Sequence, residues 1–283
     1  MKNKIKLVAG VLFAATVAVQ ATPITNGLYM ELVADDITGV ADGASVTAWN
    51  DTATTANSLA QYGTLAPVFV STNANFNNHS TVSFVGNSAL RDNSLAGTAP
   101  STETVTVFMV AQYNAQPTNN NPEWLFRSQS TGNTRLRIAR SGLNQANGGA
   151  YQTRVGGGAG IITGTNSGRN TDLILFNIRS GGNTVNFDTF SASATNSVTG
   201  NNGNGARLPQ VILGANNGPN NYANADIAEF LIYDRALSTT EIAQVNTYLV
   251  AKYAIPEPAT LGLIVIMGGG LFFARRRRRY LKI

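Results

Sequence analysis

The chain has 283 residues, and 20 Lys and Arg against 15 Asp and Glu give it a formal net charge of +5. Cysteine is absent and His79 is the single histidine, which excludes disulfides, thiolate metal centres and most histidine-based catalysis. The positive charge lies at the two ends, because residues 22–255 hold 11 basic and 14 acidic side chains, a net charge of −3. Hydrophobic residues make up 43% of the chain, which is enough for a packed core, and the slightly acidic, amide-rich composition of the middle argues against a nucleic-acid partner.

The first 21 residues have the three parts of a secretory signal peptide. Three lysines occur among the first six residues, an apolar run follows over residues 7–19, and small residues stand at Val19 and Ala21. A buried first helix is the alternative, but the order of the three parts favours export. We therefore predict a signal helix over residues 1–21, cleavage by signal peptidase after Ala21, and one exported domain over residues 22–254.

The middle of the chain shows no linker and no internal repeat. Its runs of β-branched and aromatic residues are short, and clusters of Asn, Gly, Ser and Thr separate them. This pattern is typical of an antiparallel β-sandwich or jelly roll. The predicted strands are 82–85, 104–113, 124–126, 135–140, 151–155, 172–179, 184–190, 210–213 and 225–233.

The arginines of the predicted strand 135–140 alternate with aliphatic residues. Because successive side chains of a strand point to opposite faces, Arg135 and Arg137 are expected on the face opposite Leu136 and Ile138. Arg135, Arg137 and Arg140 could meet an acidic polysaccharide. We prefer the interpretation that they form a solvated sheet face.

One helix is predicted near the end of the domain. Ser238 and Glu241 match a capping box, in which the serine oxygen accepts from a backbone amide and the glutamate reaches back. Ile242, Val245 and Leu249 then recur at helical spacing on one face. The helix is expected to end near residue 252 or 253, before a proline-containing segment.

Both ends of this domain resemble one known family. Residues 226–253, DIAEFLIYDRALSTTEIAQVNTYLVAKY, are similar to the end of a laminin-G-like, concanavalin A-like domain, and residues 39–51, GVADGASVTAWND, resemble its opening. The strand at 82–86 is similar to another family strand, with Ser83 where arginine is usual. The resemblance implies an all-β, antiparallel two-sheet jelly roll with one short C-terminal helix. It implies no activity, because this fold hosts lectins, glycosidases and adhesion modules.

Asp226 and Glu229 are the candidate catalytic pair, since sandwich-fold glycosidases place paired carboxylates on a strand. A retaining mechanism needs two carboxyl groups about 5–5.5 Å apart and facing the sugar. Residues three apart on a regular strand point to opposite faces. We therefore expect this pair not to be catalytic and the domain not to be an enzyme.

An acidic group near the start of the domain is a candidate metal site. Laminin-G-like domains sometimes bind calcium through loop carboxylates and carbonyls, which would make Asp35 and Asp36 candidate ligands. No fixed-spacing motif comparable to an EF-hand is present, and turn formation explains the neighbouring Asp42 as well. The expectation is a domain without a cofactor.

Two tryptophans and one loop are candidates for contact with sugars. Trp49 corresponds to the core tryptophan of the resembled family and is expected to be buried. Trp124 follows a polar segment and is the better candidate for an exposed stacking residue. Asn220, Asn221 and Tyr222 end an Asn-rich loop that could hold a glycan, although a plain surface loop is an alternative.

Residues 255–283 contain three unlike elements in a fixed order. Pro256, Glu257 and Pro258 come first, an apolar run covers residues 259–274, and five arginines follow directly, Arg275, Arg276, Arg277, Arg278 and Arg279. The run is slightly shorter than the roughly 20 residues of a spanning helix, and the arginines are expected to hold its far end in the cytoplasm. The two prolines keep the preceding backbone extended and open to a protease.

This order resembles the PEP-CTERM sorting signal of Gram-negative bacteria. The resemblance implies recognition of residues 256–258 by an exosortase-type membrane protease, and delivery of the cut chain to the cell surface or an exopolysaccharide matrix. A permanent tail anchor is the alternative.

Three functions stay open at this point. The leading hypothesis is an exported cell-surface or biofilm-matrix protein whose jelly roll binds carbohydrate or mediates adhesion without catalysis. The rival is an extracellular glycoside hydrolase or lyase of the same fold. The third is a purely structural matrix protein that binds no ligand.

Overall fold

The computed structural model describes residues 23–53, 57–92, 104–116, 120–129, 135–142, 150–155, 161–167, 171–181, 184–193, 195–201, 208, 210–216, 218 and 221–255. The described ranges do not include the predicted signal helix with Ala21, the loop residue Asn220, or residues 256–283 of the predicted sorting segment, which contain 256–258 and 275–279. None of the helices in these described ranges has the length and hydropathy of a membrane span.

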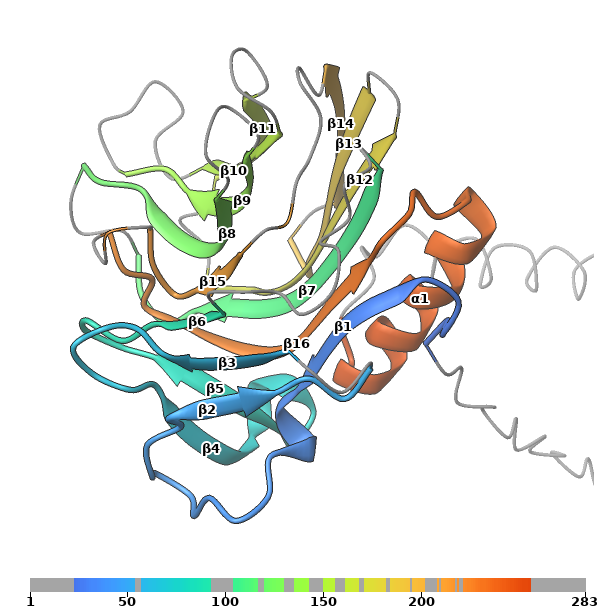
Figure 1. The fold of residues 1–283 in the computed structure, drawn as a ribbon. Helices are drawn as coiled ribbons and strands as arrows, with labels where there is room; N and C mark the ends of the chain where they lie inside the picture. The colour runs from blue at the N-terminus through green and yellow to red at the C-terminus, as the bar shows by residue number, and fades with distance from the viewer. Residues whose placement is uncertain are drawn as a thin grey trace, which may run out of the picture.

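Two antiparallel sheets form a sandwich (Figure 1). The first sheet contains, in spatial order, β14 (Thr195–Asn201), β13 (Thr184–Phe190), β12 (Leu173–Gly181), β7 (Val105–Tyr113), β16 (Ala225–Tyr233), β5 (His79–Phe84) and β4 (Val68–Asn73), and β1 (Leu28–Val33) also pairs with β16. The second sheet contains β11 (Ile161–Ser167), β10 (Ala150–Val155), β9 (Arg135–Arg140), β8 (Glu123–Gln129), β15 (Val211–Leu213), β6 (Leu90–Asp92), β3 (Ser58–Gln61) and β2 (Ala48–Asn50). Two short 3-10 helices, η1 (Ala34–Asp36) and η2 (Ala74–Phe76), follow β1 and β4.

The helix α1 (Thr239–Tyr253) covers the outer side of the first sheet. Its capping box is as predicted, because Ser238 Oγ accepts from the Glu241 amide at 3.3 Å and the Ser238 amide donates to Glu241 Oε2 at 2.8 Å. Val245, Leu249 and Tyr253 form its buried side. The helix thus buries one face of the first sheet, and the residues between them form a second, smaller core.

The sequence of the central strand β7 is apolar almost throughout because both of its faces are buried. Val107 and Met109 belong to the core between the two sheets, whereas Phe108 and Val110 pack in the cluster beneath α1. A strand buried on both faces reads as a continuous hydrophobic run rather than as an alternating one. Burial on both sides also makes β7 and its neighbour β16 the centre of the fold.

The fold is mostly β with one helix near its C-terminal end, as the sequence predicts, and each of the nine predicted strands is present. The strands that sequence reasoning missed are β1, β2, β3, β4, β6, β11 and β14. Four of these, β2, β4, β11 and β14, lie at sheet edges, where little apolar surface has to be buried and the hydrophobic pattern is weak. β3 and β6 are too short to show a period.

Candidate functional site

The outer face of the second sheet, which points away from the first sheet, carries most of the residues singled out for ligand contact. The β8–β9 pairing sets which side chains reach it. Trp124 lies opposite Ala139, and Arg127 lies opposite Arg137, whereas Phe126 and Ile138 point into the core between the sheets. A register irregularity between Trp124 and Phe126 allows this mixed arrangement.

Trp124 is only 5% exposed, so the expectation of an exposed stacking residue is wrong. Two guanidinium groups cover its ring instead, with the Cζ atoms of Arg137 and Arg127 at 4.6 Å and 5.0 Å from the ring centroid. Such cation–π contacts are favourable and orient both cations. Trp124 therefore serves as a platform for two arginines rather than as a free surface for a sugar ring. Trp49, by contrast, is buried as predicted.

The loop residues Asn221 and Tyr222 lie beside Trp124, although they are distant in sequence. The Trp124 amide donates to the Asn221 carbonyl at 3.3 Å, and a β-bridge joins Trp124 to Tyr222. Asn221 has a left-handed φ of 52°, which turns the chain back toward the sheet. The structure thus brings together three of the four predicted ligand residues, and the fourth, Asn220, is outside the described part.

Tyr62 is a member of this face that sequence reasoning missed. The Cζ atom of Arg91 lies 3.7 Å from the centroid of its ring, and its hydroxyl accepts from the Gly218 amide at 3.0 Å. Tyr62 and Tyr222 both pack against a small apolar cluster that includes Ile212. No sequence signal marks Tyr62, because its partners come from separate segments of the chain.

We call the set of Tyr62, Arg91, Trp124, Arg127, Arg137 and Tyr222 the aromatic–arginine face. Trp124 and Arg127 are buried, and the other four side chains are partly exposed. Burial, and to a lesser degree the neighbouring Tyr62, raise the pKa of Tyr222, so its hydroxyl is a neutral hydrogen-bond group at physiological pH. Guanidinium groups supply several N–H donors in a fixed plane. Chemically, the face offers apolar ring surface beside fixed hydrogen-bond donors.

The arginines of β9 do not share one environment. Arg137 lies on the outer face and donates to Gln152 Oε1 at 2.9 Å. Arg140 is fully buried, with its Nε 2.8 Å from Glu123 Oε2 and its Cζ 3.9 Å from the Tyr113 ring centroid. The interpretation of Arg140 as part of a solvated face is therefore wrong, since a buried charge has to be paired. The Arg135 side chain is not among those the structure describes.

The candidate catalytic carboxylates share a face, contrary to expectation. Asp226 pairs with Gln112 and Glu229 pairs with Val110, because the extra residue Ala228 forms a β-bulge between them. A bulge shifts the alternation by one position. Both side chains therefore point to the outer side of the first sheet, where neither is available to a sugar.

Each of these carboxylates is held by neighbouring side chains. Asp226 accepts from Asn73 Nδ2 at 3.0 Å and from Asn114 Nδ2 at 2.9 Å. Glu229 is 1% exposed and accepts from Lys252 Nζ at 2.8 Å and Tyr253 Oη at 2.7 Å. Burial and the Glu229 carboxylate raise the pKa of Tyr253. These contacts attach α1 to the sheet.

Asp35, one of the two candidate calcium ligands, is also engaged by other groups of the chain. Asp35 Oδ1 accepts from the Ser80 amide at 2.8 Å, and Asp35 Oδ2 lies 2.8 Å from His79 Nδ1 and 3.6 Å from Lys252 Nζ. Burial raises the pKa of Asp35, but the Ser80 amide and the His79 ring together bring it below its ordinary value. Among the residues that are described, no group of three or more His, Asp or Glu gathers in the way a metal ion requires. The Asp35 carboxylate is thus already engaged by contacts within the chain.

Comparison with known proteins identifies the C-terminal segment. Residues 254–279 match the family described as the PEP-CTERM protein-sorting motif. This motif implies an exported precursor that exosortase, a membrane protease, sorts to the cell surface. No curated protein matches the sequence.

Solved structures show the same β-sandwich at low identity. A mutant GH54 α-L-arabinofuranosidase aligns with a TM-score of 0.57 at 15% identity, over 75% of this chain and 52% of its own. The binding domain of botulinum neurotoxin DC in complex with SialylT aligns with a TM-score of 0.55 at 10% identity, over 80% and 52%. Trypanosoma rangeli sialidase in complex with sialic acid aligns with a TM-score of 0.50 at 13% identity, over 80% and 33%. The chain spans about half of the length of the first two proteins and a third of the length of the sialidase. At these identities the likeness establishes the fold alone. This chain is a two-sheet antiparallel β-sandwich that carries a PEP-CTERM sorting motif.

Proposed function

We propose that this protein is a cell-surface or extracellular-matrix protein whose β-sandwich binds carbohydrate without catalysis. The observation that supports binding most directly is the aromatic–arginine face, where Tyr62, Trp124 and Tyr222 come together with arginines on one sheet surface. Aromatic rings beside oriented hydrogen-bond donors suit a ligand with both apolar ring faces and hydroxyl groups.

The sorting motif independently supports the proposed location of the protein at the cell surface or in the matrix. A protein that exosortase handles is exported, and after the cut near residues 256–258 it reaches the cell surface or the surrounding matrix. Polysaccharide is the abundant polymer in such a matrix. The proposed partners are therefore signal peptidase and exosortase during maturation, and a polysaccharide afterwards.

The known structures with this sandwich include binding domains and enzymes. The toxin binding domain is recorded in complex with SialylT, and the sialidase with sialic acid. Proteins with a similar sandwich thus bind carbohydrate, and we propose the same for this chain. Function still has to be argued from the site, because one fold hosts many activities.

Glycoside hydrolysis is the second candidate, and one observation favours it. The Ala228 bulge places Asp226 and Glu229 on a common face. Against hydrolysis, both carboxylates are buried and hydrogen-bonded to side chains of the chain itself, which leaves no opening for a sugar between them. A structural role for Asp226 and Glu229 explains these contacts better than a catalytic role does.

The full chain in non-ionic detergent, applied to an array of neutral and acidic glycans, tests the proposal. Binding to at least one polysaccharide without release of reducing sugar is the expected result. Sugar release that Asp226→Asn abolishes would instead establish the hydrolase. Failure to bind any glycan, by a chain that unfolds cooperatively, would leave the purely structural matrix protein as the function.

A further inference from the structure

Arg91 on β6 has a guanidinium group that the chain itself leaves without a polar partner. Its Cζ atom lies 3.7 Å from the centroid of the Tyr62 ring. Its side chain makes no hydrogen bond and no ion pair with any described residue. Arg127, Arg137 and Arg179 differ in this respect, because each donates to an oxygen atom within the chain. Arg91 therefore has its N–H groups available for a ligand.

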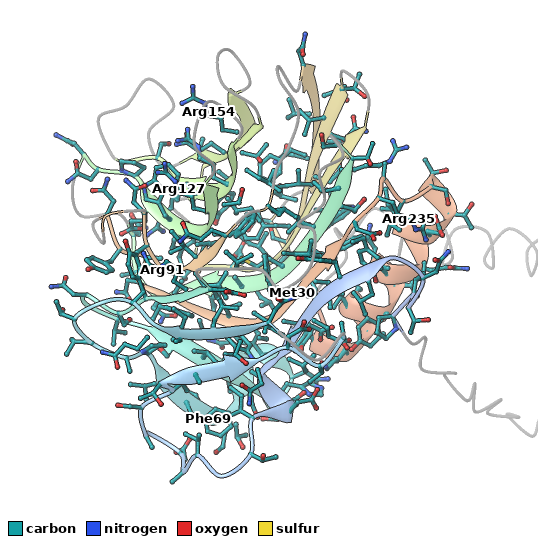
Figure 2. The ribbon with its side chains drawn as sticks, in the orientation of Figure 1. Met30, Phe69, Arg91, Arg127, Arg154 and Arg235 are labelled. Carbon is teal, nitrogen blue, oxygen red and sulfur yellow. The ribbon has the colours of Figure 1, made fainter. Side chains whose placement is uncertain are left out.

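Arg91 projects from the outer face of the second sheet. Leu90 and Asp92, the residues on either side of it, are buried, and Leu90 packs in the core between the sheets. Because successive side chains of a strand point to opposite faces, Arg91 points outward, where it is partly exposed. Figure 2 labels Arg91 at the left of the view, below Arg127.

Two alanines flank Arg91 on the side that leads to the edge of the sheet. Arg91 lies opposite Ala60 on β3, and Ala60 lies opposite Ala48 on β2. Both alanines are exposed, whereas Leu59 and Trp49 beside them are buried between the sheets. The alanines therefore share the outer face with Arg91. A methyl group projects little from a sheet, so this surface is low and the guanidinium group can be approached from this side.

Neutral hydrogen-bonding groups lie along the edge of this surface. Asn50 on β2 and Ser58 on β3 are exposed, and Ser58 Oγ donates to Asn50 Oδ1 at 2.9 Å. No described residue accepts from the Asn50 amide nitrogen. The Tyr62 hydroxyl accepts from the Gly218 amide at 3.0 Å, which leaves its own proton for a ligand. Amide and hydroxyl groups of this kind both donate to and accept from sugar hydroxyl groups.

The acidic residues next to this surface are buried and do not offset the charge of Arg91. Asp92 follows Arg91 directly and so points to the inner face. Asp51, which follows β2, is also buried and accepts from the Glu31 amide at 2.8 Å. A ligand with an anionic group would form charge-assisted hydrogen bonds to Arg91 without breaking an ion pair of the chain.

From the unpaired guanidinium group, the low alanine surface and the neutral polar groups around it, we infer that the outer face of β2, β3 and β6 is a subsite for a carboxylate-bearing sugar. Arg91 is the anion-binding residue of this subsite, and the sugar ring lies over Ala48 and Ala60. This inference rests on the proposed carbohydrate binding and names the class of sugar. Two strand steps separate Ala48 from Arg91, about 10 Å at the usual strand spacing, which leaves room for the ring.

The contact with Tyr62 suits Arg91 to a carboxylate. A cation–π contact orients the guanidinium group, whose N–H groups can then pair with a carboxylate through two parallel N–H···O bonds, a geometry that lysine cannot form. The domain as a whole has a net charge of −3 over residues 22–255. One available cation on an acidic domain favours a polysaccharide over nucleic acid, because nucleic acid is bound by clusters of basic residues.

Oligosaccharides of galacturonate, glucuronate and mannuronate, each paired with its methyl ester, are matched probes, because the two members of a pair differ mainly in charge. The full chain in non-ionic detergent should bind at least one acid form roughly tenfold more tightly than its ester at low salt. The difference should shrink as salt is raised, because exposed charges are screened.

The other outcomes separate this inference from the proposed function. Equal affinity for acid and ester in every pair overturns the carboxylate subsite while leaving carbohydrate binding intact. Absence of binding to any glycan overturns the proposed function as well. Single-stranded DNA that binds as tightly as the best acid form overturns the assignment to a sugar.

Two variants locate the subsite. Arg91→Gln should weaken binding of the acid form roughly tenfold and leave binding of the ester unchanged. Arg91→Lys should recover only part of the loss, because it keeps the charge but not the paired donors. Ala60→Glu keeps Arg91 but places a carboxylate directly opposite it, where the two side chains pair across the strands, so this variant should also lose the preference for the acid form.

Ala243→Glu is the matched control. Ala243 is exposed on α1, and its replacement changes the net charge by the same amount as Arg91→Gln or Ala60→Glu does. Thermal unfolding checks that each variant is folded. An unchanged preference for the acid form in Arg91→Gln, or an equal loss of this preference in Ala243→Glu, overturns the inference.

Discussion

Lys252, in the last turn of α1, donates to the buried carboxylate of Glu229 on β16 at 2.8 Å. Tyr253 donates to the same Glu229 oxygen at 2.7 Å, and Tyr248 does so at 3.3 Å. Tyr248, Lys252 and Tyr253 of α1 therefore converge on one acidic group. Their common role is to bind the helix to the sheet.

Removal of Lys252 tests that role. Lys252→Met should lower the free energy of unfolding by about 3 kcal/mol, because the Glu229 carboxylate stays buried without its counter-charge. Lys252→Met combined with Glu229→Gln should recover much of this loss. The measurement is urea denaturation, with Thr247→Ala on an exposed part of α1 as a control that should change little. A single variant as stable as the wild type would show that the pair does not hold the helix.

The contact between Arg235 and Glu241 predicts a pH dependence of stability. Arg235 and the Ser238 groups lower the pKa of Glu241 from 4.5 to about 2. A carboxyl group with a depressed folded-state pKa stabilises the fold fully above its unfolded pKa, and this contribution is lost as the pH falls. The melting temperature of the wild type should therefore fall between about pH 4.5 and pH 2 more steeply than that of Glu241→Gln. Parallel curves for the two proteins in this range would contradict the role of Glu241.

Gly214 connects the core to the aromatic–arginine face. Its φ is +82°, and a Cβ added there would lie 2.3 Å from Phe84 Cδ1. Gly214→Ala should lower the free energy of unfolding by about 2–3 kcal/mol, through strain and overpacking together. Its amide and carbonyl also bind Leu125 and Ala223, so the variant should weaken ligand binding too.

Gly43→Ala is the matched control for Gly214→Ala. Gly43 has a φ of +76°, and an added Cβ would meet no atom within 4 Å. The control should therefore lose only about 1 kcal/mol, from backbone strain alone. Chemical denaturation of both variants gives the comparison, and equal losses would mean that Phe84 moves aside at no cost.

The burial of both tryptophans predicts a fluorescence result. Trp49 is 1% exposed and Trp124 is 5% exposed. Acrylamide should quench the folded chain weakly and the urea-unfolded chain strongly. A Trp49→Phe variant isolates Trp124, and a strongly quenched signal from it would contradict the covering of this ring by Arg127 and Arg137.

The sequence by itself determined the features that depend on neighbouring residues. The strand 225–233, the capping box of Ser238 and Glu241, and the end of the helix at Tyr253 are present as predicted. A capping box is complete within one turn of chain, and β-branched and aromatic runs between polar turns are local patterns. The order of Pro256, the apolar run and the arginines likewise identifies the sorting motif without any folding.

Only the tertiary structure decided which side chains share a face. The Ala228 bulge, which sequence alternation cannot reveal, placed Asp226 and Glu229 on one side of the sheet. Pairing between distant strands covered Trp124 with arginines and brought Tyr222 to it. Arg91, Arg127, Arg137 and Arg154 stand in line across the second sheet because β6, β15, β8, β9 and β10 align in one register. Register and bulges arise from contacts between segments that are far apart in the chain, and a shift of one residue turns every side chain of a strand to the opposite face.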